Sequence, residues 1–104
     1  MRKKLDPILP GEILWKEFME PHGLSQNKLA RDIDVPVTRI SDIIHGRRGI
    51  TADSALRLSV YFGTTAEFWL NLQMRHELRV SRRDVLPQIE QSVRPFVGQG
   101  SMVS

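Results

Sequence analysis

The stretch that decides the fold is LARDIDVPVTRISDIIHGRR, residues 29–48. Its isoleucines, Ile40, Ile43 and Ile44, recur at the i, i+3, i+4 spacing that places side chains on one face of an α-helix. This spacing predicts a helix over about residues 36–45 with a buried isoleucine face. A glycine follows at the position where glycine commonly ends a helix. The polar residues between the isoleucines are left on the opposite face, where a helix held in the core presents them rigidly to a partner.

A second short helix is predicted immediately before this one. Ser25 is suited to cap its first turn, because a serine hydroxyl accepts a hydrogen bond from an otherwise free backbone amide. Leu24 and Leu29 have the spacing of a hydrophobic staple. Asp34 falls where a tight turn requires a left-handed backbone, which aspartate tolerates better than most residues. Residues 25–45 therefore have the form of a helix-turn-helix.

The exposed face of the second of these helices is the candidate binding surface. In DNA-binding proteins of this form the second helix enters the major groove and the first crosses the backbone. We expect Arg39 to pair bidentately with guanine and so to read sequence, whereas Arg47 and Arg48 mainly supply affinity for phosphate. The side chains expected to contact DNA are Ser25, Gln26, Val37, Thr38, Arg39, Ser41, Asp42, Arg47 and Arg48.

The same residues allow other interpretations. Two short helices also form an αα-hairpin whose polar face is simply solvated. Arg39 has a possible ion-pair partner in Asp42, since residues three apart on a helix are neighbours. The two arginines after the helix and the net charge of +3 favour a polyanionic partner, although an arginine pair equally suits a solvated helix C-terminus.

Three further helices are predicted around this pair. The first covers residues 10–20, where a proline and a glutamate suit the first turn. The next is capped by a threonine, carries Ala55, Leu56 and Val60, and ends at a glycine, over residues 51–63. The last covers about residues 65–79, with Thr64 and Glu67 at the spacing of a capping box. With the central pair, these helices predict an all-α fold, a compact bundle of about five helices.

The helix over 65–79 has apolar residues on two opposed sides. At about 100° per residue, Phe68, Trp69 and Leu72 fall on one side, and a second apolar set falls nearly opposite. One side can face the core, but the other requires a cover, for which a second copy of the chain is the simplest candidate. We therefore expect a homodimer whose interface includes Leu70, Met74 and Leu78.

Length and composition limit the classes of protein that remain. The chain has 104 residues, 40% of them hydrophobic and 26% charged, which fits one globular domain. We expect a basic N-terminal arm over 1–9, the domain over 10–80, and an extension over 81–104 with room for one short helix and a flexible tail. Without cysteine there is no disulfide or thiol nucleophile. No apolar run reaches the length that spans a bilayer, so we expect a cytoplasmic protein with no membrane partner.

Catalysis and metal binding find no support in the sequence. Ser41, Asp42 and His45 are the residue types of a hydrolase triad, but on one helical turn they cannot converge on a common acyl carbon. The other two histidines, His22 and His76, are too scattered to build a metal site with it. We expect no catalytic residue, no metal and no cofactor.

A family resemblance covers about residues 8–80. The segments PGEIL at 10–14 and LSQNKLARDIDVPVTRISDIIHGRRGITADSALRLSVYFGTTAEFWLNLQ at 24–73, with the following MRHEL, resemble the HigA/VapI antitoxins, a branch of the Xre-type helix-turn-helix proteins. The S-Q-x-x-L-A opening is common to Xre-type regulators. The segment ITADSALRLSVYFGTTAEFWLNLQ, residues 50–73, is similar to the antitoxin branch in particular.

The resemblance implies a lambda-repressor-like fold and a type II toxin–antitoxin function. Such a protein is a homodimer that neutralises an mRNA-cleaving HigB-type ribonuclease toxin by direct binding, and represses the shared operon by binding double-stranded operator DNA. Gln26 matches the family's phosphate-contacting glutamine, and Val37, Thr38 and Arg39 match its first base-reading positions. Two alternatives remain: a stand-alone regulator of the same fold, and an enzyme or RNA-binding module.

Overall fold

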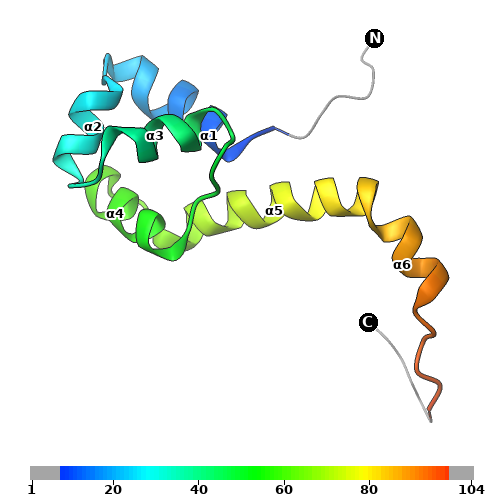
Figure 1. Cartoon of the computed structure of the whole chain (residues 1–104). Helices are drawn as coiled ribbons and strands as arrows, with labels where there is room; N and C mark the ends of the chain where they lie inside the picture. Colours follow the sequence, from blue (N-terminus) through cyan, green and yellow to red (C-terminus); the bar gives the residue numbers. More distant parts are fainter. Residues whose placement is uncertain (1–7, 99–104) are drawn as a thin grey trace.

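The computed structural model describes residues 8–98, and every regular element within that range is a helix (Figure 1). The elements in chain order are α1 (Pro10–Ile13), the π-helical segment η1 (Leu14–Met19), the 3₁₀ segment η2 (Glu20–His22), α2 (Gln26–Asp32), α3 (Val37–Ile44), α4 (Ala52–Phe62), α5 (Ala66–Asp84) and α6 (Leu86–Ser92). The expected all-α fold is confirmed. The expectations of a basic arm over 1–9 and a flexible C-terminal tail fall largely on residues 1–7 and 99–104, outside the described residues.

The first helix changes type along its length, which the sequence pattern did not indicate. Pro10 occupies its first turn as expected, but α1 passes directly into η1 and then into η2. The expected end at Glu20 was wrong by about one turn, because Pro21 is accommodated in the first turn of η2. Gly23, with a φ of 62°, ends the segment.

The core lies between these helices and centres on Trp69 of α5. Its indole is completely buried and packs against Phe18 and Phe62, with ring centroids 4.8 and 6.1 Å away. The indole Nε1 donates to the hydroxyl of Thr64 at 2.7 Å. The other buried apolar residues are Leu14, Met19, Leu29, Ala30, Ile33, Ile40, Ile43, Ile50, Ala55 and Leu58.

The bond between Trp69 and Thr64 corrects the expected start of α5. Thr65, and not Thr64, caps the helix by accepting a hydrogen bond from the amide of Phe68 at 3.0 Å. Glu67 therefore lies one position too early for a capping box. The two threonines are adjacent, and the hydroxyl of Thr64 is engaged by the buried indole of Trp69, five residues along the chain.

Helix α3 lies against α1 at a point where the two backbones come close. A Cβ atom on Gly11 would collide with the carbonyl oxygen of Ile43 and lie 2.6 Å from the Cα of Ile44. Only glycine fits this position without moving one of the helices. The place of α3 is thus fixed by direct backbone contact as well as by its isoleucines.

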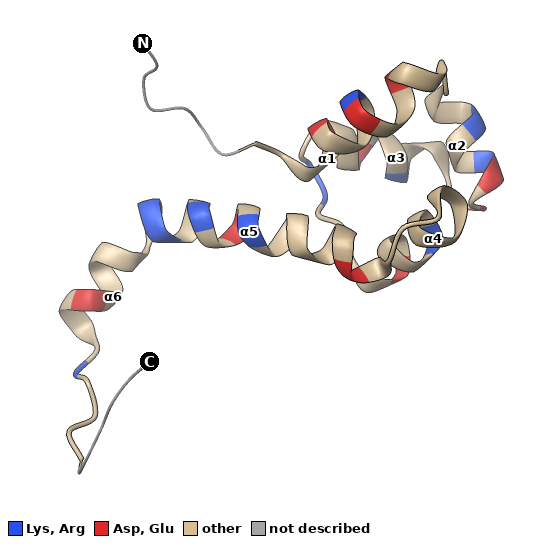
Figure 2. Ribbon diagram, turned by 180° about the vertical axis from the view of Figure 1, so that it is seen from behind, with Lys and Arg blue, Asp and Glu red and all other residues tan. Residues whose placement is uncertain are grey.

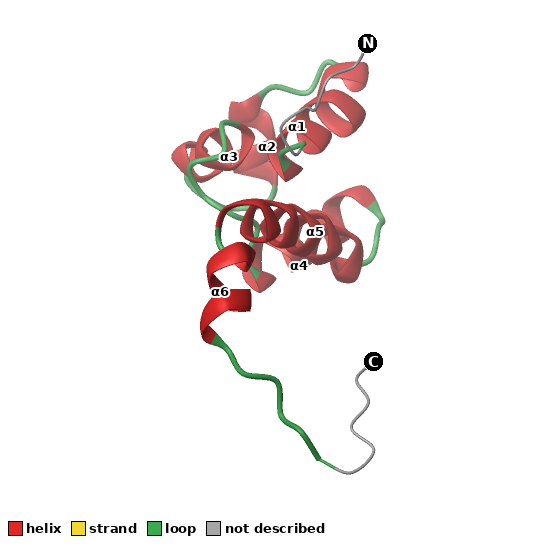
Figure 3. Ribbon diagram, turned by 90° about the vertical axis from the view of Figure 1, so that its right-hand side faces the viewer, coloured by secondary structure: helices red, strands yellow, loops and turns green. Residues whose placement is uncertain are grey.

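Helix α5 is longer than expected and leaves the bundle. It ends at Asp84 rather than near residue 79, and the short helix expected after it is α6. Figure 1 shows the far end of α5 and all of α6 standing away from α1–α4, and Figure 3 shows α6 extending below the other helices. The radius of gyration is accordingly 17.7 Å, against about 13 Å for a compact chain of this length. Over the described residues, none of the helices combines the length and apolar character needed to cross a bilayer.

Candidate nucleic-acid interface

Helices α2 and α3 are joined by the tight turn that the sequence predicts. Ser25 caps α2 by accepting from the amide of Lys28 at 3.0 Å. Asp34 adopts the expected left-handed conformation, with a φ of 60°. The amide of Val35 bonds back to the carbonyl of Ala30 at 3.0 Å, which closes the turn. These two helices therefore start and stop where their local sequence signals place them.

The two sides of α3 differ as the isoleucine spacing predicts. Ile40 and Ile43 are 1% and 2% exposed, and Ile44 is half-buried against the same core. On the other side Thr38 is exposed and carries no side-chain hydrogen bond within residues 8–98. The remaining residues expected to contact DNA are exposed at Ser25, Val37, Arg47 and Arg48 and half-buried at Gln26, Arg39, Ser41 and Asp42.

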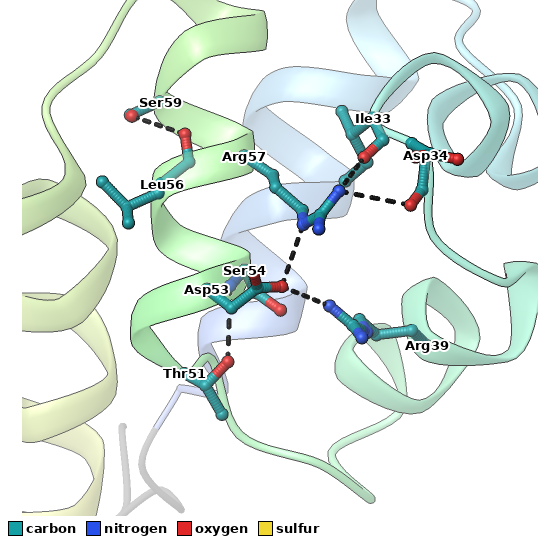
Figure 4. A network of polar contacts seen from close by, with 9 residues as sticks. All are labelled: Ile33, Asp34, Arg39, Thr51, Asp53, Ser54, Leu56, Arg57 and Ser59. Carbon is teal, nitrogen blue, oxygen red and sulfur yellow. Dashed lines mark hydrogen bonds and ion pairs between the residues drawn. The ribbon is translucent and has the colours of Figure 1, made fainter.

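Arg39 does not pair with Asp42, the alternative that the helix spacing allowed. Its Nη1 instead donates to Oδ2 of Asp53 in the first turn of α4, at 2.7 Å (Figure 4). Arg39 lies at the edge of the exposed face of α3, on the side nearest α4, and its side chain is only 26% exposed. The contact joins residues 14 apart in the chain, beyond the reach of any helical periodicity.

Asp53 is also bonded to a second arginine, which in addition contacts the turn between α2 and α3. Arg57, one helical turn along α4, donates from Nε to the same Oδ2 atom at 2.9 Å. Its Nη1 donates to the backbone carbonyls of Ile33 and Asp34, at 2.9 and 3.2 Å, in the turn between α2 and α3. Hydrogen bonds from Arg57 and then from Arg39 lower the pKa of Asp53, so its carboxylate stays ionised to more acidic pH than an ordinary aspartate.

Arg47 and Arg48 follow α3 but differ in their partners. Arg47 donates from Nε to Asp42 at 2.9 Å and from Nη2 to the Ser41 hydroxyl at 3.3 Å. The side chain of Arg48 is exposed and makes no ion pair within the described part of the chain. Of the two, Arg48 is therefore the cation free to contact a phosphate without first breaking a bond.

The loop that carries both arginines is anchored to α5. The amide of Ile50 donates to the side-chain oxygen of Gln73 at 2.9 Å, and Gln73 in turn donates to Glu77 at 2.9 Å. A Cβ on Gly49 would lie 2.8 Å from the amide nitrogen of Gln73. The long helix that leaves the bundle thus also positions the segment after α3.

Sequence reasoning missed four residues around this surface. Asp53 and Arg57 have the i, i+4 spacing of an ion pair, but nothing local indicates that Asp53 reaches α3 or that Arg57 reaches the turn before it. Gln73 contacts the loop from 23 residues away. His45 lies on the exposed side of α3, where its Nδ1 is 2.8 Å from the carbonyl oxygen of Ser41. The periodicity of α3 was a sufficient signal to include His45 among the reading-face residues.

The expected dimer residues are unequally exposed. Met74 and Leu78 are 54% and 43% exposed on the part of α5 that leaves the bundle. Leu70 is half-buried and packs against the core of its own chain. Figure 2 shows basic residues gathered towards the end of α5. The arginines of this helix are Arg75, Arg79, Arg82 and Arg83.

Comparisons with known proteins agree with this geometry. A helix-turn-helix family model matches residues 16–69. Virulence-associated protein I of Dichelobacter nodosus is 45% identical over 83 residues, 80% of this chain and 77% of that protein. An addiction module antidote protein of the HigA family from Coxiella burnetii superposes with a TM-score of 0.82 at 43% identity, covering 88% of this chain and 100% of that one. Antitoxin HigA of Pseudomonas aeruginosa, solved with the higBA promoter, superposes with a TM-score of 0.83 at 42% identity. The match covers 88% of this chain and 99% of that one.

Two short helices, a tight turn and a rigidly held polar face define a helix-turn-helix protein. The chain belongs to the helix-turn-helix family and, within it, to the group of the HigA and VapI antitoxins. The resemblance to the HigA and VapI antitoxins is thereby confirmed over most of the chain. The relatives named above are an antidote protein, an antitoxin and a virulence-associated protein.

Proposed function

We propose that this chain is the antitoxin of a type II toxin–antitoxin module that binds double-stranded operator DNA and represses its own operon. The observation that carries this proposal is the exposed polar side of α3, held in the core by Ile40, Ile43 and the backbone contact at Gly11. The relative from Pseudomonas aeruginosa was solved with promoter DNA and shares 42% of its sequence with this chain. A helix fixed in this way suits the major groove.

The contacts to DNA divide into two kinds. Thr38 offers a methyl and a hydroxyl to base edges, beside Val37, Ser41 and Asp42, while Arg39 pairs with guanine. Ser25 and Gln26 at the start of α2 contact a phosphate. Arg48, together with Arg47 once it leaves Asp42, supplies affinity that does not depend on sequence.

The protein acts on DNA as a homodimer through the outer half of α5. Support comes from the exposed apolar side chains of Met74 and Leu78, which a lone chain leaves in water. A two-fold dimer places its two α3 helices over half-sites about one helical turn, ~34 Å, apart, so the operator is palindromic.

Charges placed on this strip test the dimer. Because Leu70 belongs partly to the core, the informative variant is the double change Met74→Glu and Leu78→Glu. We expect the mass by light scattering to fall from twice the monomer mass to 12.0 kDa, with an unchanged helical circular dichroism spectrum. Val60→Glu, at an 84% exposed apolar position on α4, is the matched control and should remain dimeric. A double variant that keeps the dimer mass would place the interface elsewhere.

The second partner is an mRNA-cleaving HigB-type toxin, which the chain neutralises by direct binding. Its support is the family of the chain. The test is to express the small ribonuclease encoded beside this chain, with and without it, and to measure growth and recovery of the two proteins as a complex. We expect growth arrest that this chain relieves. Equal arrest in both cultures, with operator binding retained, would leave a stand-alone regulator as the function.

A further inference from the structure

We propose that Asp53, which lies outside the two helices α2 and α3, is a positioning residue that sets how well Arg39 discriminates between base sequences. This inference rests on the proposed binding of operator DNA through α3. Arg39 is the side chain whose forked guanidinium suits guanine, and Asp53 is the residue that holds it (Figure 4).

The geometry leaves the reading edge of Arg39 free. A guanidinium has five N–H donors, and only Nη1 is bonded, to Oδ2 of Asp53 at 2.7 Å. Within residues 8–98, Nε and Nη2 have no hydrogen-bond partner. These two nitrogens form one edge of the planar fork, which is sufficient for two parallel bonds to guanine. The contact with Asp53 therefore restricts the rotamers of Arg39 without consuming that edge.

Asp53 is itself held from two directions. It lies in the first turn of α4, after the cap that Thr51 provides to the amide of Ser54 at 3.3 Å. Its Oδ2 also accepts from Arg57, which is bonded to the carbonyls of Ile33 and Asp34. The chain of contacts thus runs from the turn through Arg57 and Asp53 to Arg39, and ties the direction of the reading side chain to the turn that sets the angle of α3.

The charge of Asp53 acts in the same direction as its geometry. An unpaired arginine at the edge of the groove gains affinity from any phosphate that it reaches, whatever the sequence. A carboxylate 2.7 Å from Nη1 offsets that attraction. Asp53 therefore lowers binding to random DNA while keeping Arg39 in place for a guanine, and both effects increase discrimination.

The experiment measures binding of the full chain to an operator duplex and to a scrambled duplex across a salt titration, by fluorescence anisotropy. For Asp53→Asn we expect the ratio of operator to scrambled affinity to fall roughly tenfold, with tighter binding of scrambled DNA. The salt slope should steepen by about one unit, as expected for one added phosphate contact. Arg39→Ala should lower the ratio similarly, and the double variant should lower it no further than Arg39→Ala alone.

Two further variants separate position from charge. Asp53→Glu keeps the charge but moves the carboxylate by one methylene, so it should lower the ratio while leaving affinity for scrambled DNA unchanged. Asp84→Asn removes the same charge from an Arg83–Asp84 pair at the far end of α5 and should leave the ratio unchanged. Circular dichroism melting of each variant checks the fold.

The outcomes distinguish the role of Asp53 from the proposed binding of operator DNA on which it rests. If the wild-type chain discriminates and Asp53→Asn discriminates equally well, the role of Asp53 is refuted and the proposed function stands. If Asp53→Asn weakens both duplexes by one factor and lowers the melting temperature, the pair serves only to join α3 to α4. If the wild-type chain binds both duplexes equally, the proposed operator binding fails, and this role with it.

Discussion

Replacing Trp69 with alanine should lower the free energy of unfolding by about 3–5 kcal/mol. The indole is completely buried and fills the space between η1, α4 and the start of α5, in contact with the rings of Phe18, Phe62 and Phe68. Domains of this size are stable by only about 5–15 kcal/mol, so the change removes a large share of the total. Urea unfolding, monitored by circular dichroism, measures this loss of stability. The midpoint urea concentration should fall while the slope of the free energy of unfolding against urea stays unchanged.

A smaller substitution at the same position separates packing from hydrogen bonding. Trp69→Phe keeps an aromatic ring but loses the donor that bonds to Thr64 at 2.7 Å, and should cost less than alanine, about 1–3 kcal/mol. The surface change Glu67→Ala in the same helix serves as a control near zero. If the alanine variant had the same midpoint urea concentration as the wild-type chain, Trp69 would not hold α5 to the bundle.

Replacing Gly11 with alanine should destabilise the chain by about 1–3 kcal/mol or more, although it adds a single methyl group. The new Cβ would collide with the carbonyl oxygen of Ile43, and backbone cannot move aside as a flexible side chain does. Either α1 or the last turn of α3 must shift. We expect a fall in melting temperature of about 4–8 °C per kcal/mol, together with weaker operator binding because α3 is displaced.

Glu17→Ala is the matched control for this prediction. It places the same residue type on an exposed position of the same continuous helix and should change the melting temperature little. If Gly11→Ala melted like the wild-type chain, the close approach of α1 to α3 would be wrong as described. If Gly11→Ala had a lower melting temperature but bound operator with full affinity, the helix that shifts would be α1 rather than α3.

The start and end signals of the helix-turn-helix were readable from sequence because they are local. Ser25 and Thr51 cap their helices as expected, and Asp34 has the positive φ that the turn requires. Each of these features depends on residues within three or four positions in the chain. The isoleucine face of α3 is local in the same sense, since it follows from helical periodicity alone.

Most of the features that sequence reasoning missed depend on contacts between helices, although His45 follows from the periodicity of α3 alone. The expectation for α4 named Ala55, Leu56 and Val60 as its apolar residues. Ala55 is completely buried, but Leu56 and Val60 are 58% and 84% exposed, and Leu58 is buried in their place. The wrong cap of α5 has a local cause instead, because the indole of Trp69, five residues along the chain, takes the hydroxyl of Thr64. The pairing of Arg39 with Asp53 needs the packing of α3 against α4, which no spacing within one helix encodes.

In helix α3 the residues that fix the helix in the core are separate from the residues that it exposes on its surface. Ile40 and Ile43, with Gly11 opposite, are closed to solvent, whereas Thr38 and His45 lie on the far side and take no part in the core. Mutations on that far side carry little folding cost. After a gene duplication, two copies of such a chain can therefore diverge in the promoter sequence that they recognise while both still fold. A few surface substitutions then suffice to stop each paralogue from acting at the promoter of the other.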